Sequence, residues 1–312
     1  MRFLTLFAIS LLPLFISLGV SSAQTPVVPM SFVAAKQPQI AVSKGAIFVA
    51  FGQSNTVYVT KSVDGGKTFL SAPLPLGTVD KLALGMRRGP RIFAGPNRIT
   101  VTAISHAEGN LYGWSSADEG TTWGPPVIVN DAKTSAREGL HAMAGNGRGE
   151  LFAVWLDLRN KGTQLWGSRS TDGGKTWQAN IKVYESPEKS ICECCHPSAL
   201  FTSDGNLVVM WRNSLNGNRD LYQIISSDGG KSFAAATKLG SESWKLKGCP
   251  MDGGSLGEVS GKIINVWRRD TSIYTNAGDG IEQLVTEKGV QPVLVATPAG
   301  DLEFIWQNEG NL

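Results

Sequence analysis

The hydrophobic positions of this chain fall in short runs that are rich in β-branched and aromatic residues and flanked by turn formers. Runs of this length and composition predict β-strands rather than helices. Six such runs recur at similar intervals, most of them opened by glycine. They occupy residues 45–51, 97–103, 149–155, 205–211, 261–267 and 300–306. We therefore expect six copies of one sheet unit.

A second short strand is expected just before each run, and five of these segments have a proline near their start. The prolines are Pro38, Pro90, Pro197, Pro250 and Pro292. If the six sheets form a ring, these strands are the innermost ones, and their ends line a central channel.

A tight-turn pattern repeats four times. The copies are Ser62-Val-Asp64-Gly-Gly-Lys-Thr-Phe69, Ser116-Ala-Asp118-Glu-Gly-Thr-Thr-Trp123, Ser170-Thr-Asp172-Gly-Gly-Lys-Thr-Trp177 and Ser226-Ser-Asp228-Gly-Gly-Lys-Ser-Phe233, with starts 54, 54 and 56 residues apart. Such a fixed period is the signature of a repeat architecture. In each copy the aspartate accepts bonds from nearby backbone N–H groups, and glycine supplies positive φ angles.

This pattern resembles the Asp-box, or BNR, repeat of sialidase-like β-propellers. The resemblance implies an all-β, six-bladed β-propeller of sialidase-like fold, formed as a single domain by residues 24–312. Asp64, Asp118, Asp172 and Asp228 are then structural. We expect Val27–Val33 to complete the last blade as an outer strand, and Trp155, Trp211, Trp267 and Trp306 to form core between blades.

The first residues have the features of a secretory signal peptide. A basic Arg2 precedes a largely apolar stretch from Phe3 to Val20, and small residues lead to an expected cut after Ala23. Residues 1–23 are therefore predicted to be removed, giving a secreted or periplasmic protein. No other stretch is long and apolar enough to span a bilayer, so no membrane span is expected after cleavage.

Charge argues against one class of partner. The chain has 29 Lys and Arg against 26 Asp and Glu, a net charge of +3, and its basic residues are scattered. Without a basic stripe, a nucleic-acid partner is not expected. A monomeric protein with a glycan or cell-envelope ligand is the broad functional prediction.

In propellers, function concentrates on the loops that lead into the inner strands. At this rim we predict ligand-binding residues before the second and third inner strands: Arg87, Arg88, Arg137, Glu138 and His141. All four cysteines and two of the three histidines also fall on this rim.

The sharpest chemical feature is a run of soft donors. Cys192, Cys194, Cys195 and His196 lie before the fourth inner strand, and Cys249 and Met251 lie before the fifth. Corresponding positions on adjacent inner strands should be neighbours. Thiolates, a thioether and an imidazole suit Cu(I) or Zn(II), so a copper or zinc site is one hypothesis.

Two other interpretations remain open. An exported protein normally pairs its cysteines as disulfides, although a full pairing here requires a bridge within Cys192–Cys195, over a very short loop. A catalytic pair, with Cys195 as nucleophile and His141 as base, is a third hypothesis.

The resemblance can also be followed to the sialidase site, where an arginine triad, a tyrosine assisted by a glutamate, and an aspartate act together. The first blade here reads Lys36-Gln37-Pro38, without the arginine of the family, and the nearest match is Arg88-Gly89-Pro90. The remaining candidates are Arg137, Arg212, Arg268, Tyr274 and Asp80. These departures leave catalysis without assigned residues.

The Cys-x-Cys-Cys-x-Pro segment and the later Cys-Pro-Met-Asp-Gly-Gly segment resemble those of bacterial exported BNR-repeat proteins labelled sialidase-like or exo-alpha-sialidase. Three functions are therefore considered: a ligand-binding propeller, a copper- or zinc-binding propeller, and a glycoside hydrolase of the exo-alpha-sialidase type.

Overall fold

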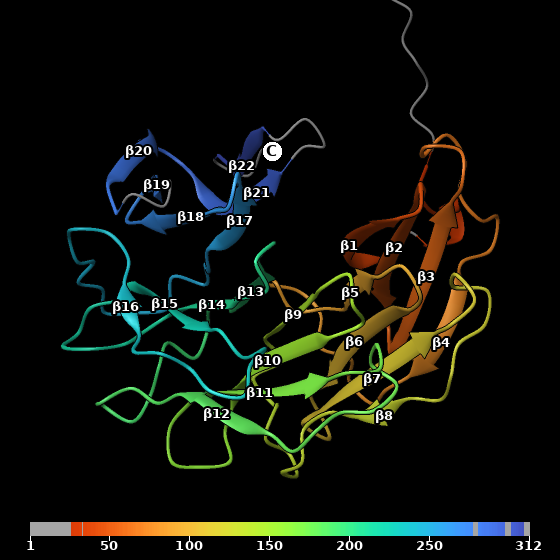
Figure 1. Cartoon of the computed structure of the whole chain (residues 1–312), viewed down its shortest axis with the longest axis horizontal. Coiled ribbons are helices and arrows are strands. Elements are labelled where there is room, and N and C mark those ends of the chain that lie inside the picture. Colours follow the sequence, from red (N-terminus) through yellow and green to blue (C-terminus); the bar gives the residue numbers. More distant parts are fainter. Residues whose placement is uncertain (1–25, 33, 277–279, 297–300, 309–312) are drawn as a thin grey trace, which may run out of the picture.

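The computed structural model describes residues 26–32, 34–276, 280–296 and 301–308 (Figure 1). The predicted signal peptide, residues 1–23, lies outside these ranges. Within them, no helix has the length and apolar character needed to cross a membrane.

The described chain contains 22 strands and one short 3-10 helix, η1 (Met30–Phe32). The first blade comprises β1 (Lys36–Ser43), β2 (Ala46–Gln53), β3 (Thr56–Ser62) and β4 (Leu74–Thr78). The second comprises β5 (Arg91–Ala94), β6 (Ile99–Ser105), β7 (Asn110–Ser116) and β8 (Val127–Ile128). The third comprises β9 (His141–Gly145), β10 (Leu151–Asp157), β11 (Gln164–Ser170) and β12 (Ile181–Tyr184).

The second half repeats this order. Blade four comprises β13 (Ser198–Phe201), β14 (Leu207–Arg212), β15 (Leu221–Ser226) and β16 (Thr237–Lys238). Blade five comprises β17 (Ser255–Val259), β18 (Lys262–Arg269), β19 (Ser272–Asn276) and β20 (Glu282–Thr286). Blade six comprises the pair β21 (Val290–Ala296) and β22 (Leu302–Gln307).

Within each blade, consecutive strands pair antiparallel. The inner strands β1, β5, β9, β13, β17 and β21 touch one another in that order around the ring. The six apolar runs correspond to the second strands β2, β6, β10, β14, β18 and β22. The predicted all-β, six-bladed propeller is therefore confirmed.

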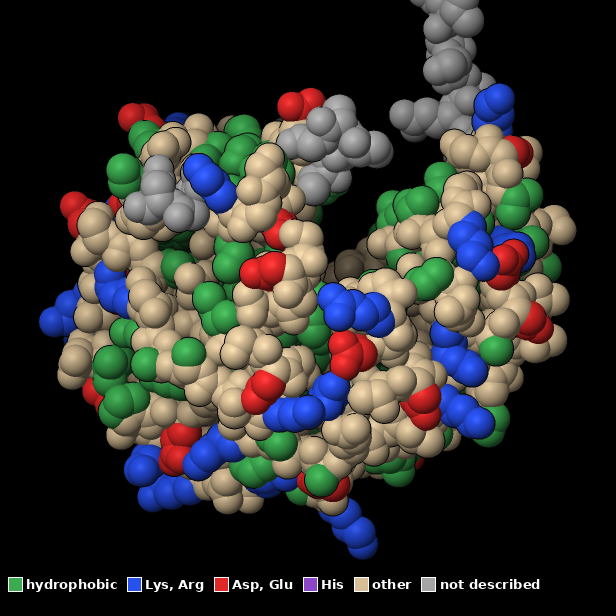
Figure 2. Space-filling view, in the orientation of Figure 1, with side chains coloured by type: hydrophobic (Ala, Val, Ile, Leu, Met, Phe, Trp, Pro, Cys, Tyr) green, Lys and Arg blue, Asp and Glu red, His purple; other side chains and the backbone are tan. Residues whose placement is uncertain are grey.

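The expectation for Val27–Val33 is wrong. Its described residues form no strand in blade six: they contain η1, and the Phe32 ring packs 5.6 Å from Phe51 and 5.1 Å from Tyr58, in blade one. Edge-on contacts between aromatic rings are favourable, and they hold this segment against blade one. The strand prediction did not take them into account. Val33 lies outside the described residues. Figure 2 shows a notch in the surface, which by its place in Figure 1 lies between the blade with β21 and β22 and the blade with β1 and β2.

The core lies between neighbouring blades. Trp155, Trp211 and Trp267 are almost fully buried, and Trp306 packs against the cluster that includes Val266 and Leu294. These tryptophans therefore act as inter-blade core, as the sequence predicted.

The four Asp-box turns share one hydrogen-bond network. In the second copy, the Ser116 hydroxyl donates to Asp118 Oδ1 at 2.8 Å, and the Thr122 N–H and hydroxyl donate to the same carboxylate at 2.8 and 2.6 Å. The copies around Asp64, Asp172 and Asp228 repeat these bonds. The Thr122 bonds, followed by that of Ser116, lower the pKa of Asp118 to about 2.

Acid should weaken these turns before the core unfolds. Because the folded pKa of Asp118 is below the ordinary value of about 4, its contribution is present above pH 4 and is lost as pH falls toward 2. We expect Asp118→Asn to lower Tm at pH 7 by roughly 2–4 °C. Between pH 4 and pH 2, the Tm of this variant should decrease less than the Tm of the original protein. Differential scanning fluorimetry across this range measures both effects. An unchanged acid slope would contradict the assignment.

The control for this change is Glu119→Gln in the same turn. The Glu119 side chain takes no part in the bonds of the turn and contacts Lys44 at the surface. Its replacement should move Tm at pH 7 by less than about 1 °C.

Candidate functional site: a three-thiol cluster beside blades four and five

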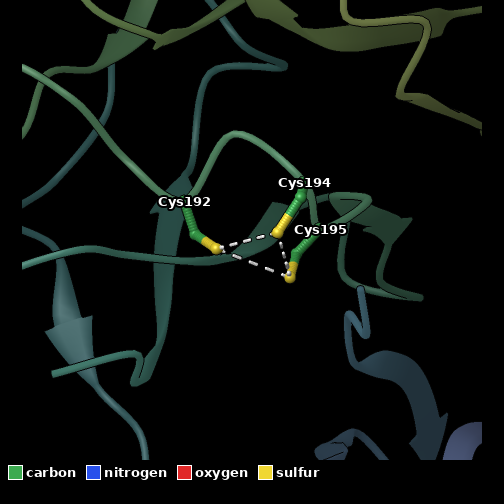
Figure 3. A group of neighbouring side chains, drawn as sticks. All are labelled: Cys192, Cys194 and Cys195. Carbon is green, nitrogen blue, oxygen red and sulfur yellow. Dashed lines mark hydrogen bonds between the residues drawn. The ribbon is translucent and has the colours of Figure 1, made fainter. Parts of the chain in front are cut away.

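Three buried cysteines meet in the connection between β12 and β13. We call Cys192, Cys194 and Cys195 the three-thiol cluster; their side chains point toward one another (Figure 3). The Sγ atoms of Cys192 and Cys194 are 3.6 Å apart, as are those of Cys192 and Cys195, and Cys194 and Cys195 are separated by 3.9 Å. All four cysteines of the chain are free thiols in the structure.

These separations match those of ligands around one metal ion. With metal–sulfur bonds of about 2.3 Å, neighbouring sulfurs lie about 3.8 Å apart in a tetrahedral site and about 4.0 Å apart in a trigonal one. The three-thiol cluster can therefore hold an ion with little rearrangement.

The pKa values of Cys192 and Cys195 are shifted in opposite directions. Bonds from the Cys194 thiol and then the Cys195 thiol lower the pKa of Cys192 to about 4, with Arg219 adding a smaller effect. Burial raises the pKa of Cys195. Cys192 is thus placed to accept hydrogen bonds from its two neighbours, which favours its thiolate form.

The connection between β16 and β17 covers the three-thiol cluster. Met251 packs against the three-thiol cluster, whereas Cys249 is exposed. β17 begins only at Ser255, so Cys249 and Pro250 belong to this connection and not to the start of the inner strand. The expected contact with a cysteine of the neighbouring connection is nevertheless present, because burial and then a hydrogen bond with the Cys194 side chain raise the pKa of Cys249.

Arg212 fixes both connections. Its guanidinium is almost fully buried and donates to the carbonyl oxygens of Asp252 at 2.9 Å, Arg219 at 2.5 Å and Arg268 at 3.0 Å. Its own carbonyl accepts the Cys192 N–H at 3.1 Å. Arg212, in β14, thus fixes the position of the three-thiol cluster relative to the β16–β17 connection that covers it.

A second arginine beside the sulfurs has unused donors. The Nε and Nη1 atoms of Arg219 are buried and have no hydrogen-bond partner among the described residues. The Arg219 charge lowers the pKa of Cys192, together with the hydrogen bonds there, and opposes the rise in the pKa of Cys249. Additional negative charge on the sulfurs would therefore be compensated.

His196 lies apart from this group, although it follows Cys195 directly. It lines a cavity of about 240 Å³ in the central channel, to which residues of all six blades contribute. Among the lining residues are Gln39, Arg87, Arg91, His196, Ser198 and Ser255. We call this space the channel cavity.

The channel cavity is positively charged and contains a neutral imidazole. Burial, followed by the charges of Arg87, Arg91 and Arg212, lowers the pKa of His196 well below its ordinary value. Burial and then Arg87 lower the pKa of Arg91 to about 10. The Arg87 guanidinium donates to the side chain and the backbone carbonyl of Gln291, both at 2.6 Å, and so links blade six to the segment before β5.

Of the five predicted rim residues, the channel cavity includes only Arg87. The Arg88 guanidinium donates to the Glu138 carbonyl at 2.8 Å, and Arg137 is exposed. His141 is fully buried, with Nε2 3.0 Å from the Thr102 hydroxyl. The structure thus brings Arg88 and Glu138 together and places His141 inside a blade.

Two of the residues considered for sialidase chemistry lie together outside the channel cavity. Tyr274 and Arg268 line a different cavity beside blade six, with Leu284 and Lys288. Arg268 contacts Asp252 at 3.5 Å. Asp80 uses its backbone carbonyl to accept the Ser105 hydroxyl at 2.5 Å.

Sequence reasoning missed most of the residues that line the channel cavity, although a signal was present. In four blades the residue after the inner-strand proline faces the cavity: Gln39, Arg91, Ser198 and Val293. The prolines identified the strands, and the next position identifies the side chains that face inward.

No family model matches this chain, and no curated protein matches its sequence. Solved structures match its fold. An intramolecular trans-sialidase from leech and one from Ruminococcus gnavus each give a TM-score of 0.55 at 12% identity over 88% of this chain. The NanB sialidase of Streptococcus pneumoniae gives 0.54 at 7% identity, also over 88%.

The matches cover 65% of the leech chain, 90% of the Ruminococcus chain and 65% of the NanB chain, so this chain spans slightly less than two thirds of two of them. These structural matches establish a sialidase-like propeller fold. At such low sequence identity they do not transfer an activity to this chain.

Removing the Arg212 guanidinium should destabilise the blade four and five region strongly. Arg212→Gln leaves buried carbonyl oxygens unpaired, and we expect the free energy of unfolding to fall by roughly 3–5 kcal/mol. Guanidinium chloride unfolding followed by tryptophan fluorescence measures the change. Arg137→Gln, at an exposed arginine, should stay within about 0.5 kcal/mol of the original protein. Equal stability of the two variants would show that the buried contacts are dispensable.

Proposed function

We propose that this sialidase-like propeller binds Cu(I) at the three-thiol cluster. The observation that carries the proposal is the convergence of three buried sulfurs at 3.6–3.9 Å. Soft thiolates are preferred ligands of Cu(I), and Met251, which packs against the same cluster, carries a thioether as a further soft donor.

Ligand number favours Cu(I) over Zn(II). Among the described residues, the group close enough to share one ion consists of three thiols and includes no imidazole or carboxylate. Structural zinc sites are almost always four-coordinate. A buried three-sulfur site with a nearby methionine suits Cu(I) better, and Zn(II) is the competing ion in the experiment below.

The surrounding charges also support the proposal. Three metal-bound thiolates and one Cu(I) carry net negative charge, which is costly to bury without compensation. The unpartnered Arg219 N–H groups lie in the field of these sulfurs, and Arg212 acts on Cys195. In the oxidising compartment expected for an exported chain, a bound ion would also keep the thiols from pairing as disulfides.

Copper binding is tested by loading reduced, metal-free protein with Cu(I) under anaerobic conditions and measuring copper per chain by elemental analysis. We expect one equivalent for the original protein. Cys192→Ser, Cys194→Ser and Cys195→Ser should each lower the affinity by at least about 100-fold in competition with a chromophoric Cu(I) chelator.

Glu193→Gln is the matched control, because Glu193 lies within the same turn with an exposed side chain. It should retain one equivalent of copper. Stoichiometric Zn(II) uptake without Cu(I) uptake would show that the three-thiol cluster binds zinc and not copper. Refusal of both ions, together with a disulfide found by mass spectrometry, would refute the metal proposal and favour the disulfide interpretation.

The channel cavity supports a second candidate, the binding of a small anionic ligand such as a carboxylated sugar of a glycan or cell envelope. The specific observation is that Arg87 and Arg91 lie beside a neutral His196 in one cavity of about 240 Å³. Guanidinium groups recognise carboxylates by paired, charge-assisted hydrogen bonds.

N-acetylneuraminic acid is the probe for this candidate, with binding followed by saturation-transfer NMR. We expect a Kd on the order of 1 mM that weakens about tenfold in Arg91→Gln. Arg148→Gln, an exposed arginine on an outer turn, serves as the control. Identical binding by both variants would exclude the channel arginines, and turnover of a fluorogenic sialoside would revive the hydrolase hypothesis.

A further inference from the structure

One cysteine stands outside the three-thiol cluster but beside it. Cys249 is exposed, whereas Cys192 and Cys195 are each 1% exposed and Cys194 is 6% exposed. The four thiols therefore form a series from solvent to interior, in which Cys194 is the most accessible of the buried three.

Cys249 and Cys194 are neighbours at the solvent end of this series. Burial raises the pKa of Cys249 to about 11, and the next contribution is a hydrogen bond with the Cys194 side chain, so the two side chains are in contact. The connection that carries Cys249 also brings Met251 against the three-thiol cluster. Cys249 is not part of the group whose sulfurs can share one ion. It thus lies within reach of one ligand without completing the site.

The backbone around Cys249 leaves it open to an incoming molecule. Lys247 and Gly248 are exposed, Gly248 has a φ of +148°, and nothing lies within 4 Å of the position of its absent Cβ. Lys245 is also exposed in this connection. The surface around Cys249 therefore combines an accessible thiol with two exposed lysines, and the exposed Glu193 carboxylate also acts on this thiol.

We propose that Cys249 is the exchange ligand through which Cu(I) passes between an anionic thiol carrier in solution and the three-thiol cluster. This inference rests on the proposed copper binding and adds its route and the chemical class of its partner. The carrier is a small anionic thiol that presents Cu(I) on its own thiolate and is attracted by Lys245 and Lys247.

The step is a ligand exchange without a redox change. The Cys249 sulfur forms a bond to Cu(I), a carrier thiolate leaves, and the Cys249 proton passes to the departing sulfur. Cys194 then displaces Cys249, which recovers a proton from the Cys194 thiol, and the ion moves onto the buried sulfurs. Copper remains Cu(I) throughout, and each sulfur–copper bond that breaks is replaced by another.

Exchange and storage separate the roles of the four thiols. A ligand that only relays an ion changes the rate of transfer more than the equilibrium affinity, since it is absent from the final site. Loss of a storage ligand lowers the affinity itself. Kinetic and equilibrium measurements on the same variants therefore distinguish the two roles.

The test uses the Cu(I) complex of glutathione as the carrier and the full-length mature chain. Stopped-flow absorbance in the ultraviolet thiolate-to-copper band follows transfer. We expect Cys249→Ser to retain one equivalent of copper and an affinity within about 3-fold of the original, and to receive copper at least about 10-fold more slowly. Ser243→Ala, in the same exposed connection, should change neither quantity.

Each outcome decides the matter. An unchanged transfer rate in Cys249→Ser, with normal binding by the original protein, would overturn the exchange role and leave copper binding intact. Loss of stoichiometric binding in Cys249→Ser would make Cys249 a storage ligand and also overturn it. Failure of the original protein to bind copper at equilibrium would refute the proposed function itself.

Discussion

The buried guanidinium of Arg212 is the contact on which the arrangement of blades four and five depends. A charge in this position is tolerated because three backbone carbonyl oxygens accept its hydrogen bonds, from Asp252, Arg219 and Arg268. Since the Arg212 carbonyl also holds the Cys192 N–H, one residue places the three-thiol cluster against the connection that carries Met251. The geometry of the sulfurs follows from a backbone scaffold and not from the sulfurs alone.

Two adjacent residues in this region serve different environments. Cys195 belongs to the three-thiol cluster, whereas His196 lines the channel cavity with Arg87 and Arg91. The turn before β13 thus separates a soft, sulfur-rich site from a cationic one. The charge of Arg212 acts on both Cys195 and His196. The two sites share no ligand, so a metal at one and an anion at the other would not compete for the same side chains.

The similarity to sialidases is a similarity of fold, and the chemistry of this chain has to be inferred from its own residues. Arg212 and Arg268 serve the contact between blades four and five, and Arg87 ties blade six to the segment before β5. These arginines stabilise a ring whose sixth blade has two strands in the described chain. A propeller of this kind can retain its shape while its loops acquire other ligands.

The sequence by itself determined the repeat, the second strands and the four Asp-box turns, because each depends on local periodicity and on residues within a few positions of one another. It also identified the soft donors, since cysteines are sparse and gathered. Only the tertiary structure decided that Cys192, Cys194 and Cys195 converge while His196 turns to the channel and Cys249 stays exposed. It also decided that Phe32 packs on blade one. Such choices depend on burial and on contacts such as that of Arg212 with Asp252, which join residues distant in sequence and leave no local pattern.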